Sequence, residues 1–121
     1  MSCLFDSISY FLPLDSYQLR QKTCNYLEDN KPIMNDLDTK FILSLDNKNY
    51  IKNMRDDDAW GGGIEISAIA NMYSLKIIVK NLRNGKQIEF LPLSKQYNTI
   101  LYISWNGNHF EPLSSIYMEE A

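Results

Sequence analysis

The spacing of apolar residues changes once along this chain, near Leu75, and that change constrains the fold more than any other feature. Before Leu75, apolar residues recur at helical spacing; after it, short runs rich in β-branched and aromatic residues alternate with turn signals. Helices followed by strands predict an α+β fold. Because 121 residues suit one core, we expect a single domain over residues 1–121, with N-terminal helices packed on a small, mostly antiparallel sheet.

Helices are predicted at residues 3–11, 17–29, 38–45, 47–54 and 64–73. Ser2 and Ser16 are placed to cap the first two, and Pro13 ends the first. Cys24 falls midway along the second helix, where we expect it to be buried. In the first two helices, the side chains expected to face the protein core are Leu4, Phe5, Ile8, Phe11, Leu12, Leu19, Thr23, Tyr26 and Leu27.

Strands are predicted at residues 75–81, 86–93, 99–105 and 109–113. The last two flank "NGN", and Asn-Gly is the dipeptide that a tight hairpin turn prefers. His109 is therefore expected to open the final strand.

The composition excludes several classes of function. Two cysteines and one histidine cannot supply the four ligands of a structural zinc site, so we expect no metal, no cofactor and only thiol chemistry at cysteine. A net charge of -3 with scattered basic residues argues against a nucleic-acid partner. No apolar run approaches the roughly 20 residues that cross a bilayer, and no signal-peptide pattern is present, so we expect a cytoplasmic protein without a membrane partner.

Cys3 stands at the start of the first predicted helix. The partial positive charge of a helix N-terminus stabilises a thiolate, and its free N–H groups can face an oxyanion. The alternative, in which Cys3 only packs against its neighbours, is the commoner role for such a cysteine.

His109 and Glu111 could complete a catalytic group. An imidazole can take and return the proton of a nucleophilic thiol, and strand alternation puts residues two apart on one face, where a carboxylate can orient the ring. Asn106 and Asn108 are alternative orienting residues. The simpler alternative is that His109 and Glu111 are surface residues of an edge strand.

Trp60 precedes three glycines and a helix that contains Glu65. Gly61 and Gly62 would let another backbone approach closely, as a peptide substrate must. The sequence fits equally well an arrangement in which the glycines only start the helix and Trp60 fills the core.

Three segments of the chain resemble the ovarian tumour (OTU) family of cysteine proteases. "CLFDSISYFL" resembles the family's nucleophile segment, D-G-x-C-L-F before a helix; "WGGGIEI" is similar to its W-G-G-x-x-E-[LI] segment; and "ILYISWNGNHFEPL" resembles its closing strand, turn and N-H-[YF]. Their order and spacing agree over nearly the whole chain.

The resemblance implies a papain-like OTU fold and a thiol-dependent deubiquitinase that cleaves after the C-terminal glycine of ubiquitin or a ubiquitin-like modifier. Cys3 would be the nucleophile, His109 the general base and Glu111 the orienting acid, where the family commonly has Asp or Asn. Ubiquitin would be the partner of a compact, monomeric member, as some viral members are.

The resemblance implies that Trp60, Gly61, Gly62 and Glu65 support the substrate cleft and the helix beneath it. The residues that we expect to bind the substrate are Trp60, Gly61, Gly62, Asp58 and Asn108. The acidic run that ends at Asp58 could attract the arginines of the ubiquitin tail, although charge runs are more often simply solvated loops.

The family's Asp-Gly before the cysteine has no match here, where only Met1 and Ser2 stand before Cys3: either the chain is trimmed or the protein manages with less. Losing an oxyanion donor costs about 100- to 1,000-fold in turnover. A weakly active or inactive ubiquitin-binding module is therefore an alternative to the deubiquitinase. A protease that processes its own precursor, as some compact viral members of the family do, is a further alternative.

Overall fold

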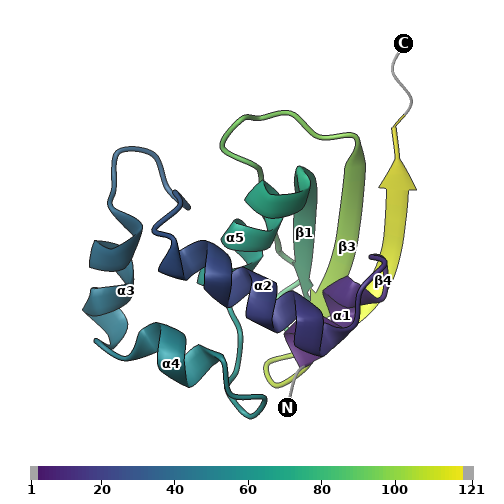
Figure 1. Cartoon of the computed structure of the whole chain (residues 1–121). Coiled ribbons are helices and arrows are strands. Elements are labelled where there is room, and N and C mark those ends of the chain that lie inside the picture. The colour runs from purple at the N-terminus through teal and green to yellow at the C-terminus, as the bar shows by residue number, and fades with distance from the viewer. Residues whose placement is uncertain (1–2, 119–121) are drawn as a thin grey trace.

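The computed structural model describes residues 3–118 and contains the predicted succession of helices and strands (Figure 1). The predicted Ser2 cap lies outside these residues. The helices are α1 (Cys3–Ser9), α2 (Ser16–Glu28), α3 (Thr39–Asp46), α4 (Tyr50–Met54) and α5 (Gly63–Tyr73). The strands are β1 (Leu75–Asn81), β2 (Gln87–Phe90), β3 (Thr99–Trp105) and β4 (Phe110–Tyr117). None of the helices within residues 3–118 is long and apolar enough to cross a membrane.

The strands form one sheet in the order β2-β1-β3-β4. The β1–β2 and β3–β4 pairs are antiparallel, as expected, whereas the central β1–β3 pair is parallel, from Leu75 opposite Thr99 to Asn81 opposite Trp105. The sheet is therefore mixed. The carboxyl ends of β1 and β3 consequently lie at the same edge, and that edge carries both hairpin loops.

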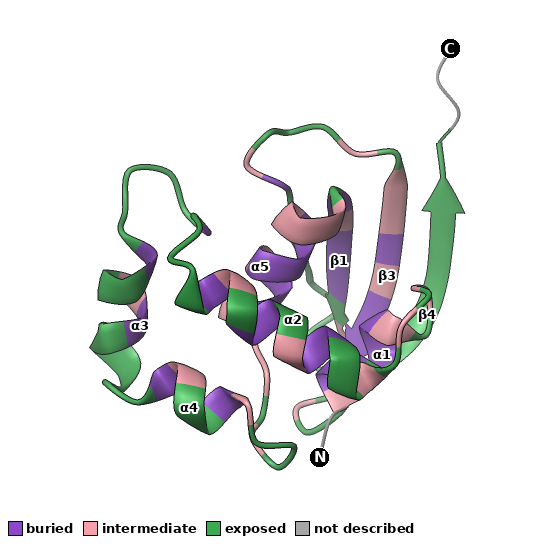
Figure 2. Cartoon of the chain, viewed as in Figure 1, coloured by how far each residue is buried: buried purple, intermediate pink, exposed green. Residues whose placement is uncertain are grey.

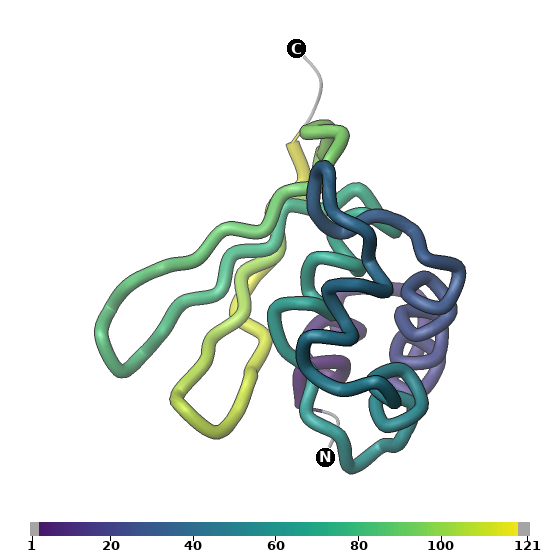
Figure 3. Tube along the Cα trace, turned by 90° about the vertical axis from the view of Figure 1, so that its left-hand side faces the viewer, coloured from purple at the N-terminus to yellow at the C-terminus, as the bar shows by residue number. Residues whose placement is uncertain are grey.

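The core lies between the sheet and the helices. Figure 2 shows buried residues on the inner sides of α2 and α5 and along β1, whereas β4 is exposed almost throughout. In the turned view of Figure 3 the helices gather on one side of the strands, which gives two layers. Burial of Leu4, Phe5, Ile8, Leu19, Thr23, Cys24 and Leu27 confirms those predictions, while Phe11, Leu12 and Tyr26 are half-buried.

The prediction that Ser16 caps the second helix was wrong, because Asp15 is the cap. Asp15 Oδ1 accepts a 2.7 Å hydrogen bond from Gln18 N, and Gln18 Oε1 accepts one of 3.0 Å from Asp15 N. This reciprocal capping box needs a Glu or Gln three residues after the cap. Gln18 stands at that distance from Asp15, so Asp15 is a stronger cap than Ser16.

Several predicted boundaries also shift. α1 ends at Ser9, two residues early, and α4 begins only at Tyr50 because Asn47 Oδ1 accepts from Asn49 N at 2.7 Å and forms a turn instead. β2 ends before Pro92, which has no N–H for a ladder bond. The final strand begins one residue after His109 and continues to Tyr117.

Candidate active site

Cys3 is the first residue of α1 and is half-buried. Its carbonyl accepts a 2.7 Å hydrogen bond from Ser7 Oγ, while the next two side chains, Leu4 and Phe5, are 1% and 0% exposed. The buried side chains fix the first turn to the core and leave the thiol at its edge. Cys24, in contrast, is fully buried, and burial raises the pKa of its thiol to about 11.

His109 lies in the β3–β4 loop, whose shape is set by Asn106. Asn106 Oδ1 accepts from the N–H groups of Asn108 at 2.9 Å and His109 at 2.7 Å, and Asn106 N donates to His109 O at 3.1 Å. Gly107 adopts a φ of 104°, which only glycine adopts easily. Because the loop already uses both lone pairs of that amide oxygen, Glu111 and Asn108 are the better candidates for orienting the imidazole.

The neighbouring β1–β2 hairpin braces this loop. Leu82 N donates a 2.9 Å hydrogen bond to Trp105 O. The Arg83 side chain lies so close to Gly107 that a Cβ there would meet Arg83 Cδ and Nη1 at 2.9 Å. The loop that carries His109 is thus held in place by its own Asn106 side chain and by Leu82 and Arg83 of the β1–β2 hairpin.

The elements that carry Cys3 and His109 are neighbours. α1 packs against β4, the strand that begins directly after His109. In both Figure 1 and Figure 3, the start of α1 and the β3–β4 loop lie at the same, lower end of the molecule. Among the described residues no hydrogen bond joins the Cys3 thiol to the His109 ring. Such catalytic bonds often tighten only when a substrate is bound.

Glu111 is the second residue of β4 and lies opposite Ser104 of β3. His109 itself lies outside β4, so strand alternation does not determine whether the two side chains share a face. Its side chain is exposed, as is that of His109, and no hydrogen bond joins the two within residues 3–118. The elements that carry Cys3 and Glu111 are thus neighbours, and His109 directly precedes one of them.

Trp60 is 63% exposed, so the alternative in which it fills the core was wrong. Gly61 has no room for a side chain, because a Cβ would fall 2.7 Å from Leu4 Cδ2 and 3.2 Å from Phe5 Cε2. A Cβ on Gly62 would meet open space. The segment that contains Trp60 and Gly61 therefore contacts the side chains of the first turn of α1.

Glu65 is 1% exposed and holds the end of this segment. Its Oε1 accepts a 2.7 Å hydrogen bond from Gly62 N, and its Oε2 accepts one of 2.6 Å from the Tyr50 hydroxyl. Burial raises the pKa of the carboxyl, and the two hydrogen bonds oppose that shift. Burial also raises the pKa of Tyr50, and the adjacent carboxylate raises it further. Sequence reasoning singled out Glu65 but missed Tyr50, which no motif marks.

An apolar hollow of about 220 Å³ opens beside the His109 loop. It is lined by Gly63, Ile66, Val79, Ile88, Phe90, Trp105 and Phe110. The rings of Trp105 and Phe110, which pair across the hairpin on either side of the loop, have centroids 4.7 Å apart. Sequence reasoning read these two residues only as strand formers, although aromatic residues flanking a turn were a usable signal.

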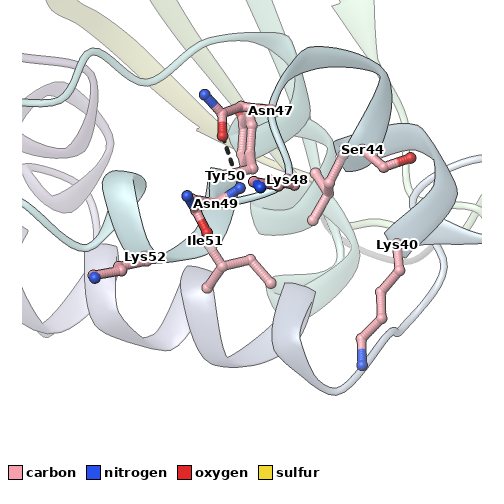
Figure 4. Close-up of a pocket in the computed structure, with 9 residues that line it drawn as sticks. Lys40, Ser44, Asn47, Lys48, Asn49, Tyr50, Ile51 and Lys52 are labelled. Atoms are coloured by element: carbon pink, nitrogen blue, oxygen red, sulfur yellow. Dashed lines mark hydrogen bonds between the residues drawn. The ribbon is translucent and has the colours of Figure 1, made fainter.

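A second hollow, of about 290 Å³, lies between α3 and α4 and is rimmed by Lys40, Lys48 and Lys52 (Figure 4). The hydrogen bond drawn there joins Asn47 and Asn49. Its lining includes no residue of α1 or of the β3–β4 hairpin, so it is separate from the candidate active site.

The acidic run before Trp60 is exposed and partly engaged within its own loop. Asp56 Oδ1 accepts a 2.8 Å hydrogen bond from Asp58 N, and Asp57 Oδ1 lies 3.9 Å from Arg20 Nε. Asp58 thus lies on the surface two residues before Trp60.

Comparison with known proteins places this geometry in a family. The family model described as OTU-like cysteine protease matches residues 2–110. Ubiquitin thioesterase OTU1 of Rattus norvegicus is 28% identical over 93% of this chain and 33% of its own length, and Ubiquitin thioesterase Otu1 of Drosophila melanogaster is 29% identical over 99% and 34%. The chain therefore spans about a third of the length of these relatives.

Solved structures agree. An OTU domain in complex with ubiquitin superposes with a TM-score of 0.75 at 28% identity, over 94% of this chain and 64% of that one. The viral OTU domain protease from Dera Ghazi Khan virus has a TM-score of 0.71 at 17% identity, over 95% and 75%, and supports the fold alone. With a family model covering most of the chain and the same fold in its neighbours, this chain belongs to the OTU-like cysteine protease family.

Proposed function

We propose that this chain is a thiol-dependent deubiquitinase that hydrolyses the bond after the C-terminal glycine of ubiquitin or a ubiquitin-like modifier. The observation that carries the proposal is the half-buried Cys3 at the start of α1. This helix packs against β4, the strand that follows His109. Relatives named ubiquitin thioesterases, and a neighbouring OTU domain solved with ubiquitin, support ubiquitin as the partner.

The proposed chemistry needs only side chains of this chain and water. Cys3 Sγ attacks the glycine carbonyl carbon while the His109 ring accepts the thiol proton, and the ring then gives that proton to the departing amine. Water hydrolyses the resulting thioester, with His109 taking its proton, and releases the glycine carboxylate and the free thiol. In this scheme Glu111 orients the imidazole.

The surroundings suit an extended tail that ends in a small residue. Gly61 lies against the side chains of Leu4 and Phe5, the two residues after Cys3, and the apolar hollow lined by Trp105 and Phe110 lies beside the loop that carries His109. The exposed Trp60 and Asp58 offer an aromatic surface and a negative charge for a basic tail, and Asn108 offers an amide at the loop.

Labelling with ubiquitin that carries a C-terminal electrophile tests the proposal. One ubiquitin should add to the wild-type chain and to C24A, and none to C3A; peptide mass spectrometry should place the adduct on Cys3. His109→Gln should lower the hydrolysis rate about 100- to 10,000-fold. Absence of an adduct on a chain shown to be folded would contradict the proposal.

The same experiment separates the alternatives. If C3A binds ubiquitin measurably but the wild-type chain turns over nothing, the chain is a binding module. If ubiquitin does not react while a ubiquitin-like modifier or a precursor peptide reacts at Cys3, the proposed mechanism is retained and the substrate is a different one.

A further inference from the structure

Arg20 of α2 is an arginine whose side chain is 0% exposed. Burying a guanidinium is costly unless hydrogen bonds and charges compensate it. A buried arginine therefore marks a place where distant backbone groups have been brought together.

The guanidinium binds one short segment of backbone. Nη1 donates to Met54 O at 2.8 Å, and Nη2 donates to Ala59 O at 2.9 Å and Asp57 O at 3.3 Å. All three carbonyls belong to residues 54–59, which end directly before Trp60. A planar fork with several N–H donors suits three carbonyls spread along a loop.

The same guanidinium also contacts the helix that carries the candidate nucleophile. Its Cζ lies 4.5 Å from the centroid of the Phe5 ring, within cation–π range. Phe5 in turn borders Gly61, since a Cβ there would lie 3.2 Å from Phe5 Cε2. Arg20 thus touches the loop at one end and α1, two residues after Cys3, at the other.

Residues 54–62 are consequently fixed at both ends. Arg20 holds Met54, Asp57 and Ala59, and Glu65 holds Gly62 through its 2.7 Å hydrogen bond. Trp60 and Gly61 lie between the two anchors. The loop has no regular secondary structure after α4, so these side chains determine where it runs.

We propose that Arg20 is a positioning residue for the substrate: it sets how closely residues 54–62 approach the first turn of α1, and thereby the space that the substrate tail has beside that turn. This inference rests on the proposed function. Arg20 acts through the loop, and it contacts no reacting atom.

Arg20→Lys tests the inference, because lysine keeps the charge but a single ammonium group cannot bind three spread carbonyls in the same geometry. With a fluorogenic ubiquitin C-terminal amide as substrate, KM should rise about tenfold, which is the effect expected for losing roughly one hydrogen bond. The value of kcat should stay within about threefold of the wild-type value. The rate of Cys3 alkylation by iodoacetamide should stay as in the wild-type chain. Hydrogen exchange at amides 55–62 should accelerate.

Leu27→Ala is the matched control, since Leu27 is also fully buried on α2 but lies two turns farther along the helix. It should lower stability without changing KM or the exchange of amides 55–62. Gly61→Ala changes the same loop while Arg20 stays intact, so it can be used if R20K proves too unstable to assay. The added methyl group should push the loop away from Leu4 and thereby also raise KM.

An unchanged KM in folded R20K or in G61A, or an equal rise in L27A, would overturn the inference. If the wild-type chain hydrolyses nothing, the proposed function fails separately. The dissociation constant of ubiquitin for C3A and for C3A/R20K then decides whether Arg20 positions residues 54–62 for the substrate. We expect about tenfold weaker binding for the double variant, and equal binding would contradict the inference.

Discussion

The Tyr50 hydroxyl donates a 2.6 Å hydrogen bond to Glu65 Oε2, and the other oxygen of that carboxylate accepts from Gly62 N at 2.7 Å. One buried carboxylate therefore joins α4 to the Gly62 backbone, next to the glycine that contacts the first turn of α1. Since a buried carboxylate is stable only when donors surround it, the tyrosine hydroxyl indirectly stabilises the position of Gly62.

Tyr50→Phe should lower the free energy of unfolding by about 1–3 kcal/mol, because it leaves a buried carboxylate oxygen without its hydroxyl donor. Urea denaturation measures the change. Tyr26→Phe is the matched control: the Tyr26 hydroxyl donates to Pro32 O at 2.6 Å, but this bond is exposed, so its loss should cost only about 0.5–1 kcal/mol. Equal costs for the two variants would show that burial of the Tyr50–Glu65 pair has no special weight.

Glu65→Gln should change how stability depends on pH. Burial raises the pKa of Glu65 above 4.5, so the folded chain keeps its proton to a higher pH than the unfolded chain does. The stabilisation of the folded chain that follows from this raised pKa is fully present below pH 4.5, and it is lost as pH rises through the folded-state pKa of Glu65. The free energy of unfolding of E65Q minus that of the wild-type chain should therefore increase with pH above 4.5, in denaturation series at several pH values. A constant difference would mean that the pKa of Glu65 is not raised by folding.

Much of the layout was predictable from the sequence because local patterns determine it. The spacing of Leu4 and Ile8 predicted the buried face of α1, and the Asn-Gly dipeptide predicted the hairpin that carries His109. Cys3 and His109 could be proposed because few residue types perform nucleophilic catalysis and the chain contains only two cysteines and one histidine.

The supporting residues were not predictable, because their roles depend on contacts between distant segments. An arginine in a helical pattern is normally exposed, and Arg20 is buried only because the carbonyls of residues 54–59 fold onto it. Tyr50 likewise acquires its role only once Glu65 packs opposite it. The parallel pairing of β1 with β3 has no local signal either, since the pattern of each strand fits both directions.

Only one of the two cysteines should react in the folded chain. Burial raises the pKa of Cys24 to about 11, and its side chain is fully enclosed, whereas Cys3 is half-buried. Iodoacetamide at pH 8 should therefore modify Cys3 alone, and both cysteines in urea, as mass spectrometry can show. Modification of Cys24 before unfolding would contradict the packing of α2.

The raised pKa of Cys24 also has a consequence for stability. The unfolded chain ionises this thiol near pH 9 and the folded chain only near pH 11, so the stabilisation present below pH 9 should be lost between those values. Cys24→Ala should flatten the decline of the free energy of unfolding over this range. An equally steep decline in C24A would assign it to other groups.

Gly107→Ala should disturb the loop that carries His109 for two reasons. Gly107 has a φ of 104°, which costs an alanine about 1–3 kcal/mol, and the new Cβ would meet the Arg83 side chain at 2.9 Å. We expect a stability loss of about that size in urea denaturation. We also expect hydrolysis of a ubiquitin C-terminal amide to fall at least about tenfold, because small displacements of catalytic groups are costly.

Gly85→Ala separates the two causes, because Gly85 also has a positive φ, 73°, but a Cβ there meets nothing within 4 Å. It should cost stability and leave the hydrolysis rate nearly unchanged, since the added methyl group would contact neither Arg83 nor the His109 loop. Combining G107A with Arg83→Ala should recover part of the loss by removing the crowding but leaving the backbone strain. If G85A lowers hydrolysis as much as G107A does, the effect is general destabilisation, and the position of the His109 loop is not what limits turnover.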